Sequence, residues 1–141
     1  PRTEPAAFIV WNGDEAVRRN STAGGAFSAL AEYVLEGGGV VFGAALDDGL
    51  KVSHIAVKNL HDLPRLRGAK PVQSDVGESY QQARLYLDQG RQVLFSGTPC
   101  QVDGLYRYLG EHPERLITCD VACGGVCSPG VWEKFVRSMA A

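Results

Sequence analysis

The second half of the chain alternates between helical and strand periodicity, and this alternation limits the possible folds more than any other feature. The predicted segments are helix 80–90, strand 92–96, helix 102–109, strand 116–121 and helix 132–139. Strands that alternate with helices in this way are typical of parallel strands joined by right-handed crossovers. Loops follow both strands, so we expect them to meet at one edge of a sheet.

The first half adds a helix and a β-hairpin to this arrangement. The predicted segments are an opening strand 8–11, a helix from Ser21 or Thr22 to 35, strands 40–46 and 51–58 joined by Asp47-Asp48-Gly49, and a short helix within 59–70. A length of 141 residues is usual for one hydrophobic core. We therefore predict a single α/β domain, 1–141, with a largely parallel sheet flanked by helices and an added β-hairpin.

Composition narrows the setting in which such a domain works. The apolar share is 45%, the charged share 21% and the formal net charge -2, so we expect a folded protein without the basic surface that nucleic acid binding requires. The sequence predicts neither membrane insertion nor a signal peptide, which favours a cytoplasmic location. The chain begins at Pro1 rather than Met and stops directly after a helical pattern, which indicates a fragment of a longer protein.

One cysteine stands where a predicted strand turns into a helix. Cys100 follows Gly97-Thr98-Pro99, and the positive end of a helix dipole favours a thiolate for metal ligation or nucleophilic attack. A buried structural cysteine beside a tight turn is the alternative interpretation, because free cysteines are often buried.

Three more cysteines are clustered in and directly after the next strand. Cys119 lies within the predicted strand and is interpreted as a core residue, whereas Cys123 and Cys127 lie in a glycine-rich loop. Their spacing argues against a zinc site and lacks the two-residue gap of common thiol–disulfide pairs. Four thiolates are enough for an iron–sulfur cluster, although the spacing matches no common cluster motif.

Two polar segments are candidates for an anionic ligand. The stretch 21–25 offers hydroxyls and backbone amides at a helix start, although taken alone it is better explained as an ordinary helix cap with small residues. Arg67, Lys70, Gln73 and Ser74 form a polar stretch that either contacts a cofactor or is a solvated loop. The three histidines, His54, His61 and His112, are interpreted as structural because their spacing suggests no metal site.

Four sequence blocks together resemble the coenzyme F-420 hydrogenase/dehydrogenase beta-subunit family. The blocks are Ser21 to Leu30, Leu66 to Asp75, Ser96-Gly97-Thr98-Pro99-Cys100-Gln101 and Asp120 to Val126. The resemblance extends from about Asn12 onward. It implies an oxidoreductase subunit that uses FAD and a 4Fe-4S cluster to move reducing equivalents to or from a deazaflavin coenzyme, a ferredoxin or a similar acceptor. It also implies a redox partner subunit or a ferredoxin-like electron carrier.

The resemblance also implies roles for individual residues. Cys100 and Cys123 are expected as cluster ligands, with Cys127 as an added ligand. The expected flavin-site residues are Ser21, Thr22, Gly24, Gly25, Lys70, Gln73, Ser74, Gly97 and Thr98.

Two departures from the family pattern support a second hypothesis. Where the family commonly has Cys-His-Gly-Val-Pro-Ser-Pro, this chain has a glycine at 124 and a cysteine at 127, and the ferredoxin-like cysteine runs of the family are absent. A fragment of this extent can be inactive by itself. The alternative to an electron-transfer module is therefore a scaffold or partner-binding domain that kept the fold and lost the cluster.

Overall fold

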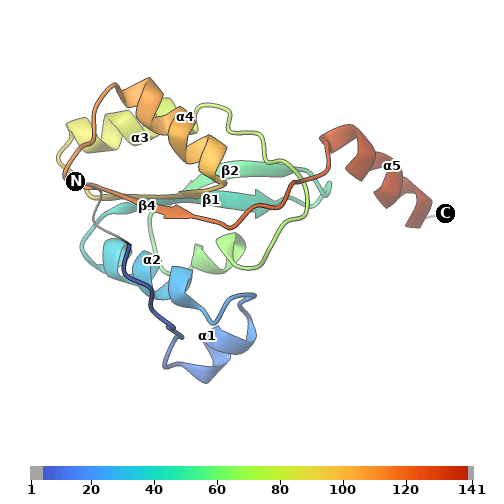
Figure 1. Cartoon of the computed structure of the whole chain (residues 1–141), viewed down its shortest axis with the longest axis horizontal. Coiled ribbons are helices and arrows are strands. Elements are labelled where there is room, and N and C mark those ends of the chain that lie inside the picture. The colour runs from blue at the N-terminus through green and yellow to red at the C-terminus, as the bar shows by residue number, and fades with distance from the viewer. Residues whose placement is uncertain (1–4, 140–141) are drawn as a thin grey trace.

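The computed structural model describes residues 5–139 and contains one four-stranded sheet between two layers of helices (Figure 1). The strand order is β2-β1-β3-β4, formed by β1 (Val40–Leu46), β2 (Val52–Val57), β3 (Val93–Gly97) and β4 (Leu116–Asp120). The pairs β1–β3 and β3–β4 are parallel, whereas β1 and β2 form an antiparallel hairpin. The predicted α/β class with an added hairpin is therefore confirmed.

The central strands are apolar because helices cover both of their faces. Every residue of β3 is buried, as expected for a parallel strand in the middle of a sheet. On one face, α2 (Ala26–Glu36) and the 3₁₀ turn η1 (Leu63–Leu66) pack against Val41 and Leu94. On the other face, α3 (Ser79–Asp88) and α4 (Pro99–Leu109) pack against Phe42 and Phe95.

The helix α5 (Pro129–Met139) differs from the other long helices in that none of its residues is buried. Figure 1 shows it projecting from one end of the sheet, well away from α3 and α4. Phe135 is 54% exposed and Met139 is 74% exposed. The apolar stripe that predicted this helix is real, but most of it faces outward in the described part of the chain.

The N-terminal segment departs from the sequence prediction. The residues 8–11, predicted as an opening strand, form no strand and are largely exposed, with Ile9 at 92%. This run lies outside the four-stranded sheet, and the Asn12 amide that follows it donates instead to the Gly24 carbonyl before α2. A short helix that the sequence analysis did not predict, α1 (Glu15–Arg19), follows, capped by the Asp14 carboxylate, which accepts hydrogen bonds from two backbone amides.

The predicted start of α2 was also wrong. Ser21 donates its hydroxyl backward to the carbonyl of Val17, so it completes α1 rather than capping α2. Gly25 is the N-cap instead, in the left-handed conformation with φ of 79°. A Cβ at that position would lie 2.9 Å from the Cβ of Asn12, so both backbone conformation and space favour glycine.

Candidate functional site

A crevice of about 620 Å³ opens where the parallel strands end. Its walls come from the start of α2, the loop 66–74, the ends of β3 and β4, and the first turn of α4. In open α/β sheets, ligands usually bind outside the carboxyl ends of the strands, so this is the expected place for a site. Segments from most of the chain contribute to it.

The start of α2 offers unpaired backbone donors to the crevice. Ala26, Phe27 and Ser28 form the first turn of α2 and line the crevice, and among residues 5–139 no side chain caps their amides. The first intrahelical bond of this turn runs from the Ala29 amide to the Gly25 carbonyl. An α-helix start with free amides attracts anions such as phosphate.

Two cations approach the crevice from the loop that follows η1. The Arg67 guanidinium donates to the Ser28 hydroxyl at 3.0 Å and lies 3.5 Å from the Glu32 carboxylate, which ties the loop to α2. The Lys70 ammonium donates to the carbonyl of Arg67 at 2.7 Å, and burial lowers the pKa of this lysine. Lys70 is therefore a half-buried cation that lines the same crevice as the start of α2.

Cys100 is exposed in the first turn of α4 and lines the crevice. The sequence favours a helix start here because Thr98 and Gln101 form a capping box, with Pro99 at the first helical position. The Cys100 sulfur lies 3.1 Å from the Thr98 hydroxyl. The structure thus places Cys100 where the strand-to-helix turn predicted it.

The remaining cysteines do not join Cys100 in a complete ligand set. All four cysteines are free thiols, and within residues 5–139 no group of three or more His, Cys, Asp and Glu side chains is arranged to hold a metal ion. Cys123 is exposed and lines the crevice, whereas Cys127 lies outside it and donates to the carbonyl of Pro71. The described residues alone therefore do not assemble the expected three-cysteine site.

Cys119, interpreted from sequence as a core residue, is half-buried and also lines the crevice. Burial raises the pKa of its thiol, and a hydrogen bond with Ser96 partly offsets this. A thiol of raised pKa is mostly protonated at neutral pH, which makes it a poor nucleophile.

The crevice also contains a buried histidine that sequence spacing did not single out. His54, on β2, is 7% exposed, and its ring stacks on Phe95 with the centroids 5.1 Å apart. Its Nε2 lies 3.0 Å from the Ser96 carbonyl oxygen, and its Nδ1 lies 2.8 Å from the Ser74 hydroxyl. Burial lowers the pKa of His54, and the bond to Ser96 opposes that shift. Its partners are 20 and 42 residues away, so no local motif marks it.

Most of the residues expected to bind the cofactors meet in this crevice. Those that line it are Ser21, Thr22, Gly25, Lys70, Gln73, Ser74, Gly97, Thr98, Cys100 and Cys123. Gly24 and Cys127 do not line it. The carbonyl of Gly24 accepts a hydrogen bond from the Asn12 amide, so this residue joins the N-terminal segment to the start of α2.

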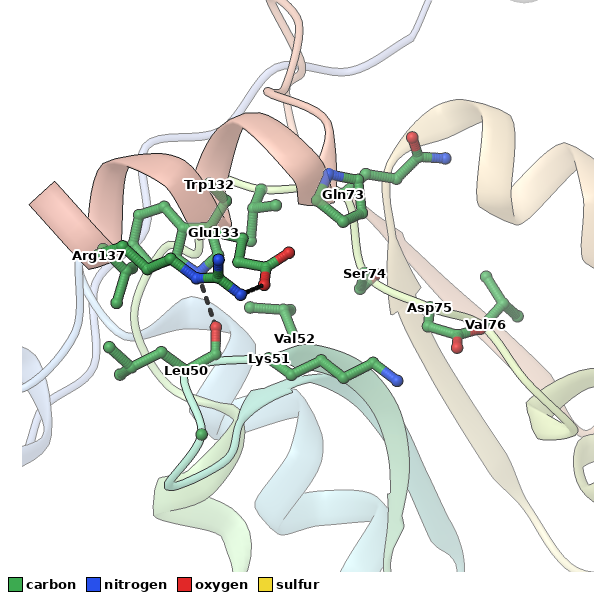
Figure 2. A pocket seen from close by; sticks show the side chains of 14 residues that line it. Leu50, Lys51, Val52, Gln73, Ser74, Asp75, Val76, Trp132, Glu133 and Arg137 are labelled. Atoms are coloured by element: carbon green, nitrogen blue, oxygen red, sulfur yellow. Dashed lines mark hydrogen bonds and ion pairs between the residues drawn. The ribbon is translucent and has the colours of Figure 1, made fainter.

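A second cavity, of about 810 Å³, lies between α5, the hairpin turn and the segment 72–76 (Figure 2). The Trp132 indole donates to the carbonyl of Leu50 at 2.6 Å, and Glu133 pairs with Arg137 along the helix. Lys51, Asp75, Glu133 and Arg137 line this cavity, so it has charges of both signs. Nothing in this mixture favours one ligand class.

Within residues 5–139, no helix combines the length and apolar character needed to cross a membrane. A scan against models of known protein families finds no match, and a search of curated proteins finds none either.

The search of solved structures finds a similar fold. A chain of the F-420-reducing NiFe hydrogenase complex from Methanosarcina barkeri matches with a TM-score of 0.71 at 20% sequence identity, over 90% of the present chain. The chain spans 47% of the length of that hydrogenase chain. At this level of identity the likeness establishes a shared fold.

Proposed function

We propose that the crevice binds FAD and that the protein is an electron-transfer module of an oxidoreductase. The observation that carries this proposal is the meeting, in one crevice, of residues from all four sequence blocks that resemble the beta-subunit family. The fold shared with a chain of the F-420-reducing hydrogenase complex supports it. A redox partner subunit or a ferredoxin-like carrier would exchange electrons with the module.

The residues of the crevice fit a flavin nucleotide. Free amides at the start of α2 and the Lys70 ammonium match the charge of a diphosphate. Apolar side chains such as Phe27, Leu66 and Val72 provide surface for the rings of the ligand. A bound flavin would supply the chemistry that links two-electron to one-electron transfer, while the protein binds and orients it.

Iron–sulfur chemistry is a separate part of the proposal. Cys100 and Cys123 line the crevice as exposed thiols, and they are the two cysteines that we propose as cluster ligands. A 4Fe-4S cluster commonly takes four thiolates, so further ligands would have to come from elsewhere.

FAD titration of the protein, followed by quenching of flavin fluorescence, tests the flavin site. Replacing Lys70 with Met removes a half-buried cation, so we expect FAD affinity to fall at least about tenfold. Lys51→Met is the matched control, because it removes a lysine from the cavity beside α5. Failure of the unaltered protein to bind FAD, or equal losses in both variants, would overturn the proposal.

The cluster is tested by purification without oxygen and iron analysis. If Cys100 is a ligand, Cys100→Ser should lower iron content while FAD binding and folding are retained, because serine is tolerated in the first turn of a helix. A scaffold role is the alternative function, favoured by the lack of a three-residue metal site among the described residues. Protein that contains neither iron nor flavin after such a purification would support the scaffold.

A further inference from the structure

The floor of the crevice is a chain of hydrogen bonds that joins four segments. It runs from the Ser96 carbonyl on β3 to His54 on β2, then to Ser74 in the loop and to Gln101 on α4. Gln101 Nε2 lies 2.9 Å from the Ser74 hydroxyl oxygen. Within the described chain no fully buried side-chain nitrogen or oxygen lacks a partner. Such a satisfied polar network fixes the position of each member.

One end of this hydrogen-bond network is fixed by a backbone group that can only accept a hydrogen bond. The Ser96 carbonyl accepts from His54, so the Nε2 atom of the ring carries the hydrogen. Burial lowers the pKa of His54, which supports a neutral ring. In a neutral ring with hydrogen on Nε2, Nδ1 is an acceptor. The Ser74 hydroxyl, 2.8 Å away, must therefore donate to it.

The other end of the network is fixed by a backbone group that can only donate a hydrogen bond. The Thr98 amide donates to Gln101 Oε1 at 3.0 Å, as part of the capping box that starts α4. Because Oε1 faces Thr98, the amide nitrogen of Gln101 faces Ser74 and donates to its hydroxyl oxygen. Two backbone groups thus set the direction of every hydrogen bond between them.

Ser74 is left with one unused lone pair and no free proton. Its hydroxyl donates to His54 and accepts from Gln101, and a hydroxyl has one donor site and two acceptor sites. We propose that Ser74 accepts a hydrogen bond from a ring N–H of the ligand, and that His54 is a positioning residue that keeps Ser74 an acceptor. This inference rests on the proposed FAD site. Oxidised FAD has one N–H on its isoalloxazine ring, at N3, so the structure assigns the pyrimidine edge of the ring to this floor.

The direction of the network can be measured without any ligand. Imidazole ¹⁵N shifts of His54 should show hydrogen on Nε2 at neutral pH in the free protein. They should report the Nε2–H form in Ser74→Ala as well, because the Ser96 carbonyl is unchanged. Hydrogen on Nδ1 would overturn the inference whether or not FAD binds.

Recognition of the ring is tested by comparing FAD with its N3-methylated analogue. The unaltered protein should bind FAD about threefold to tenfold more tightly than the methylated analogue, which is the difference in affinity expected from one net hydrogen bond. Ser74→Ala should abolish this preference, because it removes the acceptor. Ser74→Thr keeps the hydroxyl and should keep the preference, which separates loss of the acceptor from general damage.

His54→Phe tests the positioning role. Phenylalanine can keep the stacking on Phe95 but offers no acceptor to Ser74, so the hydroxyl becomes free to turn toward the crevice. The preference for FAD over the methylated analogue should fall toward unity. His61→Phe, at a side chain that is 96% exposed, is the control and should leave the preference unchanged. Thermal unfolding of each variant verifies that the fold is retained.

The outcomes separate this inference from the proposed function. Equal binding of the two flavins, or a preference that survives in Ser74→Ala, would overturn the inference while the FAD site stands. Binding of neither flavin would overturn the FAD site and the inference together. If His54→Phe proves unstable, the Ser74→Ala and Ser74→Thr pair still decides whether Ser74 is the acceptor.

Discussion

The crevice and the cavity beside α5 are similar in size but differ in how their walls are held. Side-chain hydrogen bonds link β2, β3, the loop 66–74 and α4 around the crevice, and its histidine and glutamine are buried. None of the residues of α5 is buried. Its side chains are joined to the rest of the described chain by the hydrogen bond from the Trp132 indole to the Leu50 carbonyl. Figure 2 shows that bond beside the Glu133–Arg137 pair, which lies within the helix.

This difference separates a preorganised site from a loosely attached surface. Groups held by packing and satisfied hydrogen bonds keep their positions when a ligand arrives, so less ordering is required on binding. A helix with few buried contacts opens at low cost in free energy. A small ligand is therefore expected to bind at the crevice rather than at the cavity beside α5.

The first prediction tests the rigidity of the crevice wall at the start of α2. Gly25→Ala places a side chain at φ of 79° and brings its Cβ within 2.9 Å of the Asn12 Cβ. We expect a loss of about 2 to 4 kcal/mol in the free energy of unfolding, from backbone strain and crowding together. Urea denaturation followed by circular dichroism measures it.

Gly38→Ala is the matched control for this substitution. Gly38 has a φ of 75° but no atom within 4 Å of the added Cβ, so it tests backbone strain alone. The free energy of unfolding of Gly38→Ala should fall by about 1 to 2 kcal/mol. Equal losses at both positions would mean that the contact with Asn12 gives way easily, and that this wall of the crevice is not rigid.

The strands were predictable because their signals are local. The strand β1 has the bounds that its apolar run and glycine boundary predicted, and the crossovers follow from the alternation of helix and strand. The segment 8–11 was wrongly predicted as a strand, because an apolar run does not by itself show which strand it would pair with, and these residues lie outside the sheet. Ser21 and Thr22 failed as caps because the sequence did not reveal α1, whose last turn accepts the Ser21 hydroxyl.

The location of the candidate site was predictable from the sequence, but the hydrogen-bond network that forms its floor was not. The crevice lies at the strand ends where the cysteine loops placed it, and it contains Cys100 and Cys123. Cys127 lies outside because it follows the strand end by seven positions and its backbone pairs with Val72 instead. His54 was interpreted as structural because the spacing of the histidines suggested no metal site. Its hydrogen-bond partners are distant in sequence, so three-dimensional contacts alone reveal its place in the floor.

The second prediction compares a buried histidine of the crevice with an exposed one outside it. Because the pKa of folded His54 lies below its unfolded value of 6.5, the unfolded chain takes up a proton first as pH falls. The contribution of neutral His54 is therefore fully present above about pH 6.5 and is lost as pH falls toward the folded pKa, by at most about 1.4 kcal/mol per pH unit. Urea denaturation between pH 5.5 and 7.5 measures the slope.

Two substitutions identify the source of that slope. His54→Gln removes the titrating group and should flatten the dependence of unfolding free energy on pH in this range. His61→Gln, at an exposed side chain, should leave most of the slope in place. A slope that survives in His54→Gln would show that another group controls stability here, and that burial of this histidine is not a feature of the crevice's stability.

The last prediction concerns α5 and has the smallest expected effect. Trp132→Phe keeps an aromatic side chain but removes the indole donor that bonds to the Leu50 carbonyl. The bond lies at an exposed position and none of the residues of α5 is buried, so we expect global unfolding free energy to change by less than about 1 kcal/mol. Hydrogen exchange should nevertheless accelerate in α5, while β3, whose residues are all buried, exchanges as before. Exchange measured by mass spectrometry resolves the two segments. A large global loss, or faster exchange in β3, would show that α5 unfolds together with the sheet, and the two cavities would then share one cooperative structure.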